Sequence, residues 1–363
     1  MWKKYFMTCV CLGVTMAAGG CQSTELEQRS FPLAAGIDLR EEGEQKNLVV
    51  SFDFPDLAQI SEKGRTTETA MGLSLEGMDM YHVEKSYENN TNRLLDYNHM
   101  KAVILGEGLL KDKEQLRTLL LSWEQREESA RNTSLFVGAG SAAEILSLTE
   151  ETEGSMGNYL EEMLESQKDF KQNKIATVGS LMNQWHNQNE LLLIPVLTEG
   201  GGRPLITGYE AMVNFEHRGI ITVEEAMESF LCQNLLEKFT CETVKNQVVE
   251  ITDLRVSKTI TKEGDLPVVI VSVSGKGKQK TGQISSVSEQ YQLEKKIEKQ
   301  LQADLMETGE KFQQEYGMDL TNSYVALGGH NRELYQKYKN DPDAYNQEVQ
   351  QIFQVDISLM NWE

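Results

Sequence analysis

The chain has 363 residues, of which 39% are hydrophobic and 25% charged, and its formal net charge is −21. This composition is typical of a folded protein and excludes an intrinsically disordered one, while the length allows two or three domains with sizeable cores. The negative charge would repel phosphate backbones and anionic lipid headgroups, so nucleic-acid binding is excluded as an expected function.

The first element is an N-terminal processing signal in residues 1–20. Lys3 and Lys4 precede an uncharged, mostly apolar stretch from Tyr5 to Ala18, and small residues follow it. The stretch is too short to cross about 30 Å of hydrocarbon at roughly 1.5 Å per residue. It therefore predicts a cleaved signal peptide rather than a membrane-spanning helix.

Cys21 directly follows these small residues, and the composition then becomes polar. This arrangement resembles the lipobox of bacterial lipoproteins. The resemblance implies that Cys21 becomes the first residue of the mature chain and carries a thioether-linked diacylglycerol, with a further acyl chain such as palmitate on its amino group. Two acyl chains hold a protein on a membrane much better than one. The alternative is an ordinary secreted protein in which Cys21 is incidental.

Residues 21–30 are predicted to be a lipidated tether, and residues 31–199 an N-terminal mixed α/β domain of one or two subdomains. Apolar runs at 31–37 and 48–54 predict a hairpin around a polar turn. Farther along, short strands alternate with helices. Ser141 is followed three residues later by Glu144, a pattern that predicts a capping box at the start of a helix. The expected elements are a helix near 78–87, strands at 100–105 and 132–138, a helix at 111–127, helices within 156–188 and a strand at 191–197.

Three consecutive glycines, Gly200 to Gly202, predict a domain boundary. Residues 204–363 are then a C-terminal α+β domain. Its most distinctive feature is a long amphipathic helix at 285–316, with apolar residues at a spacing of four. Thr222 and Glu225 predict a second capping box. The other expected elements are a strand at 205–215, a turn at 216–219, a helix at 222–238, strands at 244–260 and 266–274, helices at 333–339 and from 341, and a strand at 355–359. The whole chain is thus predicted to be α+β, with several small mixed sheets flanked by helices.

Two cysteines, Cys232 and Cys241, remain beyond the predicted signal and Cys21. Outside the cytoplasm they can form a disulfide. The alternative is two unrelated thiols, with Cys232 buried in a helix. The spacing alone leaves both open.

No catalytic or metal-binding motif stands out. The five histidines lie in no paired metal spacing, and no nucleophile-elbow motif is present. The segment from Gly275 to Lys278 lacks the remaining residues of a phosphate-binding loop. It predicts a hairpin turn, with a small basic patch as the alternative. We therefore predict no enzyme activity, no metal and no cofactor.

Several segments, taken in order, form a recognisable pattern. They include Gly36-Ile37-Asp38 and the run from Asn98 to Gly106-Glu107. The others are 131–137, 142–146, 194–196 and 208–215, followed by Arg218-Gly219 and the helix at Glu224-Glu225. In their order and spacing these segments resemble the Ger(x)C family of spore germination lipoproteins.

This resemblance implies a non-enzymatic lipoprotein on the outer face of the cytoplasmic membrane, or spore inner membrane, anchored through Cys21. It implies the C subunit of a nutrient germinant receptor, assembled with A-type and B-type integral membrane subunits, that helps to trigger spore germination. Two other functions remain as alternatives. A solute-binding lipoprotein of a transporter would need two similar lobes, and an extracytoplasmic hydrolase would need a catalytic residue.

Overall fold

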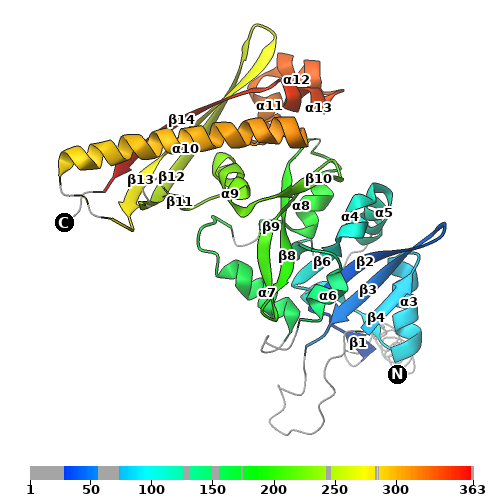
Figure 1. Cartoon of the computed structure of the whole chain (residues 1–363). Coiled ribbons are helices and arrows are strands. Elements are labelled where there is room, and N and C mark those ends of the chain that lie inside the picture. Colours follow the sequence, from blue (N-terminus) through cyan, green and yellow to red (C-terminus); the bar gives the residue numbers. More distant parts are fainter. Residues whose placement is uncertain are drawn as a thin grey trace, which may run out of the picture.

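The computed structural model describes residues 28–55, 73–125, 131–148, 155–172, 175–187, 189–242, 247–282, 284 and 286–360. These residues form an eight-stranded mixed sheet, a four-stranded sheet and a small parallel pair of strands, all flanked by helices (Figure 1). The predicted α+β class with mixed sheets is confirmed, and the chain's fold is dominated by the large sheet.

The large sheet has the strand order β10-β9-β8-β7-β6-β2-β3-β4. Its four central strands run parallel, and antiparallel strands extend it at both ends. β6 and β7 are buried along their whole length, because a parallel sheet is covered on both faces. The strands are β2 (Ala34–Glu42), β3 (Gln45–Asp53), β4 (Leu73–Gly77), β6 (Ala102–Gly106), β7 (Ser134–Gly138), β8 (Leu192–Gly200), β9 (Arg203–Val213) and β10 (Glu216–Ile221), and the separate pair is β1 (Arg29–Ser30) with β5 (Leu94–Leu95).

Helices cover the two faces of this sheet in separate groups. Side chains alternate between the faces along each strand, so Ile37 and Val103 belong to one core cluster while Ala34 and Ala102 belong to another. The first cluster includes residues of α3 (Met80–Thr91), α4 (Glu107–Lys111), α5 (Lys113–Glu124) and α8 (Val178–Asn183). The second includes residues of α6 (Ala142–Leu146) and α7 (Met156–Glu165).

The C-terminal part is built on the four-stranded sheet β11-β12-β13-β14, in which β14 runs parallel to β13. The long helix α10 (Val287–Tyr316) lies along this sheet (Figure 1). Its predicted apolar stripe, Leu293, Ile297, Leu301 and Leu305, is buried. The remaining elements are α9 (Val223–Cys232), β11 (Phe239–Glu242), β12 (Val248–Glu263), β13 (Leu266–Gln279), α11 (Tyr324–His330), α12 (Arg332–Tyr338), α13 (Pro342–Glu348) and β14 (Gln350–Leu359).

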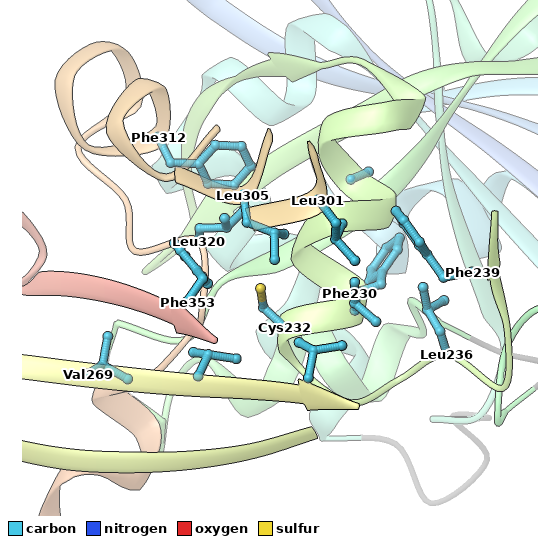
Figure 2. Close-up of a cluster of buried hydrophobic side chains, with 14 of the residues drawn as sticks. Phe230, Cys232, Leu236, Phe239, Val269, Leu301, Leu305, Phe312, Leu320 and Phe353 are labelled. Atoms are coloured by element: carbon cyan, nitrogen blue, oxygen red, sulfur yellow. The ribbon is translucent and has the colours of Figure 1, made fainter. Parts of the chain in front are cut away.

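One hydrophobic cluster continues from the large sheet into the C-terminal part. Tyr209 and Ala211 on β9 belong to the same cluster as Phe230 on α9, Leu305 on α10 and Phe353 on β14. Figure 2 shows Phe230, Leu305 and Phe353 of this cluster gathered in one core. The two sheets are therefore joined by a shared core.

The expected boundary at Gly200 to Gly202 is not a change of sheet. Gly200 pairs with Arg203 across a tight turn, and β8 and β9 on either side are neighbours in the large sheet. Gly201 and Gly202 both adopt positive φ, 65° and 81°, which glycine tolerates without steric cost. The glycines thus make a hairpin turn inside one sheet.

Two further local predictions are corrected by long-range packing. Gly275 to Lys278 lies within β13 and is not a turn. A Cβ atom on Gly275 would stand 2.6 Å from Ile251 Cγ2, and one on Gly277 would stand 2.6 Å from Leu359 Cδ2, so close packing explains both glycines. The turn predicted at 216–219 lies instead at Asn214 and Phe215, and β10 begins at Glu216.

Candidate functional site

The predicted lipidation residue, Cys21, lies outside the described residues. Within the folded body, a cavity of about 210 Å³ lies between α4 and the strands β9 and β10. Both charged and apolar side chains line it: Glu107, Leu110, Lys111, Glu210, His217 and Ile220. We therefore treat this cavity as the candidate site of the body.

Strand alternation places Glu210 at the cavity. Its neighbours Tyr209 and Ala211 point into the core shared with the C-terminal part, so Glu210 points to the opposite face, toward α4. The Glu210 side chain is only 2% exposed. A carboxyl group is rarely buried to this extent without a partner.

The partner of Glu210 is His217. His217 Nδ1 lies 2.5 Å from Glu210 Oε1. The pairing of β10 with β9 shifts register between His217 and Gly219, a bulge of the kind that reorients a side chain next to a functional site. Gly219 has φ +147°, and a Cβ atom there would stand 2.8 Å from the Tyr316 ring, so this position requires glycine.

Burial disfavours the charged form of both partners. Burial, together with a smaller contribution from the nearby Glu107 carboxylate and against the opposing effect of Lys111, raises the pKa of Glu210 to about 8. Burial also lowers the pKa of His217. At neutral pH we therefore assign a protonated Glu210 carboxyl group that donates its hydrogen bond to a neutral imidazole.

Glu107 is the charged carboxylate of the cavity. Its Oε2 accepts a hydrogen bond from Lys111 Nζ at 3.0 Å, and its Oε1 accepts one from the Gly140 N–H at 3.1 Å. The bond from Lys111 is the main reason that the pKa of Glu107 is lowered. Glu107 therefore connects the cavity to the loop after β7.

The same loop is held by Asp38, from the Gly36-Ile37-Asp38 segment. Asp38 accepts hydrogen bonds from Ser141 Oγ and from the N–H groups of Ala142 and Ala143. The predicted capping box is corrected here, because the Ser141 side chain makes no cap bond and Asp38 caps α6 instead. Two segments that carry the family resemblance, those ending in Asp38 and Glu107, thus meet at the same loop.

The cavity can hold and exchange a proton, and it can bind a small polar group. Its six described lining residues include no hydroxyl or thiol nucleophile. In the described part of the chain, no group of three or more His, Cys, Asp or Glu side chains is placed to hold a metal ion. The positive observation in the cavity is the contact between Glu210 and His217, which supports a proton-sharing pair.

Sequence reasoning did not identify this pair. One signal was present, because Glu210 is the only charged residue in the apolar run from Ile206 to Val213. His217 could not be assigned from the sequence, because a bulge between paired strands places it. Three other histidines make contacts away from this cavity: His82 bonds Asp79, His99 lies against the Phe31 ring, and His330 bonds the Ala326 carbonyl.

Cys232 and Cys241 are both buried free thiols, so the disulfide alternative is not realised. Cys232 lies among Phe230, Leu320 and Phe353 in the shared core (Figure 2). Burial raises the pKa of both thiols, that of Cys241 to about 11. The pair has a packing role in the core.

The known proteins that this chain resembles are spore germination proteins. Residues 22–199 match the family model described as the spore germination protein N-terminal domain, a match that ends next to the Gly200 turn. A comparison with curated protein sequences gives no match. The fold is similar to the structure titled "Crystal Structure of the GerBC protein", with a TM-score of 0.59 and 18% sequence identity over 91% of this chain and 98% of the other. In the described residues, no helix has the length and apolarity needed to cross a membrane. Residues 22–199 therefore belong to the family of spore germination protein N-terminal domains, and the chain as a whole has a fold similar to that of the GerBC protein.

Proposed function

We propose that this chain is the C subunit of a spore nutrient germinant receptor. The match of residues 22–199 to the spore germination N-terminal domain carries the proposal. The fold likeness to the GerBC protein, which extends over 91% of the chain, supports it. The subunit acts by assembling with A-type and B-type integral membrane subunits rather than by catalysis.

The proposal includes a lipid anchor on Cys21. A short apolar stretch followed by small residues and this cysteine supports a diacylglycerol thioether, which would hold the body on the outer face of the membrane. The alternative of a solute-binding lipoprotein is not favoured. It requires two similar lobes, whereas the described residues form an eight-stranded mixed sheet and a different four-stranded sheet.

Spore germination after deletion of the gene tests the function. We expect spores without this chain to lose their response to at least one germinant in a panel of amino acids and sugars, and to recover it when the gene is restored. Unchanged responses to every germinant that the strain recognises would contradict the proposal. Crosslinking of spore membranes tests assembly, because the chain should then copurify with two polytopic proteins.

Replacement of Cys21 tests the anchor separately. Cys21→Ala should release the chain from the membrane fraction and weaken germination, because the acylated sulfur is lost. A Cys241→Ala variant is the matched control, since that thiol is buried in the body. Retention of Cys21→Ala in the membrane fraction would exclude the lipid anchor and leave receptor membership to the deletion experiment.

A further inference from the structure

A second concavity, of about 500 Å³, lies where the large sheet meets the C-terminal helices. It is lined by α5, by the residues after α8, by the β9–β10 turn and by the segment between α12 and α13. We call it the basic groove, defined by Lys113, Arg117, Trp185, Phe215, Lys339 and Asn340.

The charge of the basic groove is opposite to that of the protein. The chain has a net charge of −21, yet the described residues that line the groove include three cations and no acidic side chain. Lys113 is paired with Glu216 at 2.7 Å. Among the described residues, Arg117 and Lys339 have no carboxylate partner within 4.0 Å. Two cations are thus left available in a protein with an excess of acids.

An aromatic floor lies beside these cations. The ring centroids of Trp185 and Phe215 are 5.0 Å apart, and the Arg117 guanidinium carbon lies 5.9 Å from the Phe215 centroid. A guanidinium held over an aromatic face keeps its edge N–H groups available for a planar carboxylate. Lys339 and Asn340 are exposed at the rim.

Phe215 contributes its ring to this floor from a strained, left-handed backbone conformation. Asn214 and Phe215 have φ of 54° and 61°, the left-handed values of a two-residue hairpin turn. Glycine is the usual residue at such a second position, and a bulky residue there carries a steric cost. Gln184 holds the turn, because its Oε1 accepts from the Phe215 N–H at 2.8 Å and its Nε2 donates to the Met212 carbonyl at 3.2 Å.

We propose that the basic groove docks an acidic segment of a partner polypeptide. Its carboxylates would pair with Arg117 and Lys339, and an apolar side chain of the segment would pack on Trp185. Arginine and tryptophan are the residue types that dominate protein interfaces, and the charge of the groove complements an acidic chain. A simple inorganic anion would leave the aromatic surface unused. This proposal rests on the proposed function in one respect only. The partner that supplies the acidic segment is a neighbouring receptor subunit.

Binding of a fluorescein-labelled peptide that alternates glutamate and tryptophan, measured with the full-length chain in detergent, tests the proposal. We expect binding that weakens with added salt. The double variant Arg117→Glu with Lys339→Glu should lower the affinity for the peptide at least about tenfold. Trp185→Ala should also lower the affinity, but without changing how it depends on salt. The matched control is Lys296→Glu with Lys299→Glu on α10, which changes the net charge equally at exposed lysines away from the groove and should bind as the unmodified chain does.

Any of the following outcomes would overturn the proposal. The unmodified chain does not bind the peptide, the two charge-reversed pairs lose affinity for it equally, or a peptide with glutamine in place of glutamate binds equally well. Displacement of the peptide by inorganic phosphate at equal affinity would show a simple anion site. Groove-dependent binding to phosphatidylglycerol vesicles without peptide binding would show a lipid-binding face. If charge reversal unfolds the chain, Arg117→Gln with Lys339→Gln serves instead and should also weaken peptide binding. None of these measurements requires receptor assembly, so failure here leaves the germination experiments to decide the proposed function.

Discussion

Asn189 and Asn346 hydrogen-bond to each other in both directions. Asn189 Nδ2 donates to Asn346 Oδ1 at 2.7 Å, and Asn346 Nδ2 donates to Asn189 Oδ1 at 3.0 Å. Both side chains are buried, at 3% and 2% exposure. Asn189 precedes β8 and Asn346 lies on α13, so the pair joins the large sheet to the C-terminal helices.

Replacement of Asn346 should therefore weaken the contact between the two parts. In Asn346→Leu the buried Asn189 Oδ1 loses its donor, while Asn189 Nδ2 keeps the Pro342 carbonyl as an acceptor at 3.1 Å. We expect the free energy of unfolding to fall by about 1–3 kcal/mol in urea denaturation. The control is Gln347→Leu, an exposed position on the same helix, which should change stability by less than about 0.5 kcal/mol. Equal effects of the two variants would show that the paired amides do not matter.

Asp38→Asn tests the cap of α6. The Asp38 carboxylate accepts from the N–H of Ala142 at 2.8 Å with one oxygen and from the N–H of Ala143 at 3.0 Å with the other. Asparagine retains one acceptor only, so we expect a loss of about 1–2 kcal/mol and faster hydrogen exchange at these two amides. Asp265→Asn, in the turn between β12 and β13, is the control. Unchanged exchange at both amides would contradict the assigned cap.

The Glu210 carboxyl group should make stability depend on pH. Its pKa is raised from 4.5 to about 8, so between these values the folded chain keeps a proton that the unfolded chain releases. The free energy of unfolding must then fall as pH rises, by up to about 1.4 kcal/mol per pH unit. His217, whose pKa is lowered from 6.5, acts in the opposite direction only below that value. The informative window is therefore pH 6.5 to 8.

In Glu210→Gln this fall should largely disappear, as measured by urea denaturation across the window. Glu228→Gln is a useful comparison, because burial raises the pKa of Glu228 to about 7 and its contribution ends at lower pH. A Glu210→Gln variant with the same slope as the unmodified chain would rule out the protonated carboxyl group.

The buried thiols should resist alkylation in the folded chain. Burial raises the pKa of Cys241 to about 11 and also raises that of Cys232, so little reactive thiolate forms at pH 8. We expect iodoacetamide to label both residues only after guanidinium unfolding, as read by peptide-resolved mass spectrometry. Rapid labelling of the folded chain, or recovery of a disulfide-linked peptide, would contradict the buried free thiols.

Local signals predicted many of the elements. The capping box at Thr222 and Glu225 is confirmed in both of its hydrogen bonds, because all its atoms lie within one turn of chain. The apolar stripe of α10 was also evident, since a helix repeats its faces over a few residues. Ser141 shows the limit of such reasoning. Its capping role was predicted from spacing, yet Asp38 fills it from a strand 104 residues away from Ala142.

The sequence by itself predicted most of the elements, the α+β class and the resemblance to spore germination proteins, because these depend on neighbouring residues and on ordered motifs. The processing signal stays a prediction from the sequence. Only the tertiary structure decided that Gly200 to Gly202 turns a hairpin within one sheet, that Gly275 lies inside a strand, and that Glu210 meets His217. The physical reason is that strand pairing and close packing join residues distant in sequence. A glycine or a buried acid acquires its role from the partners that the fold brings to it.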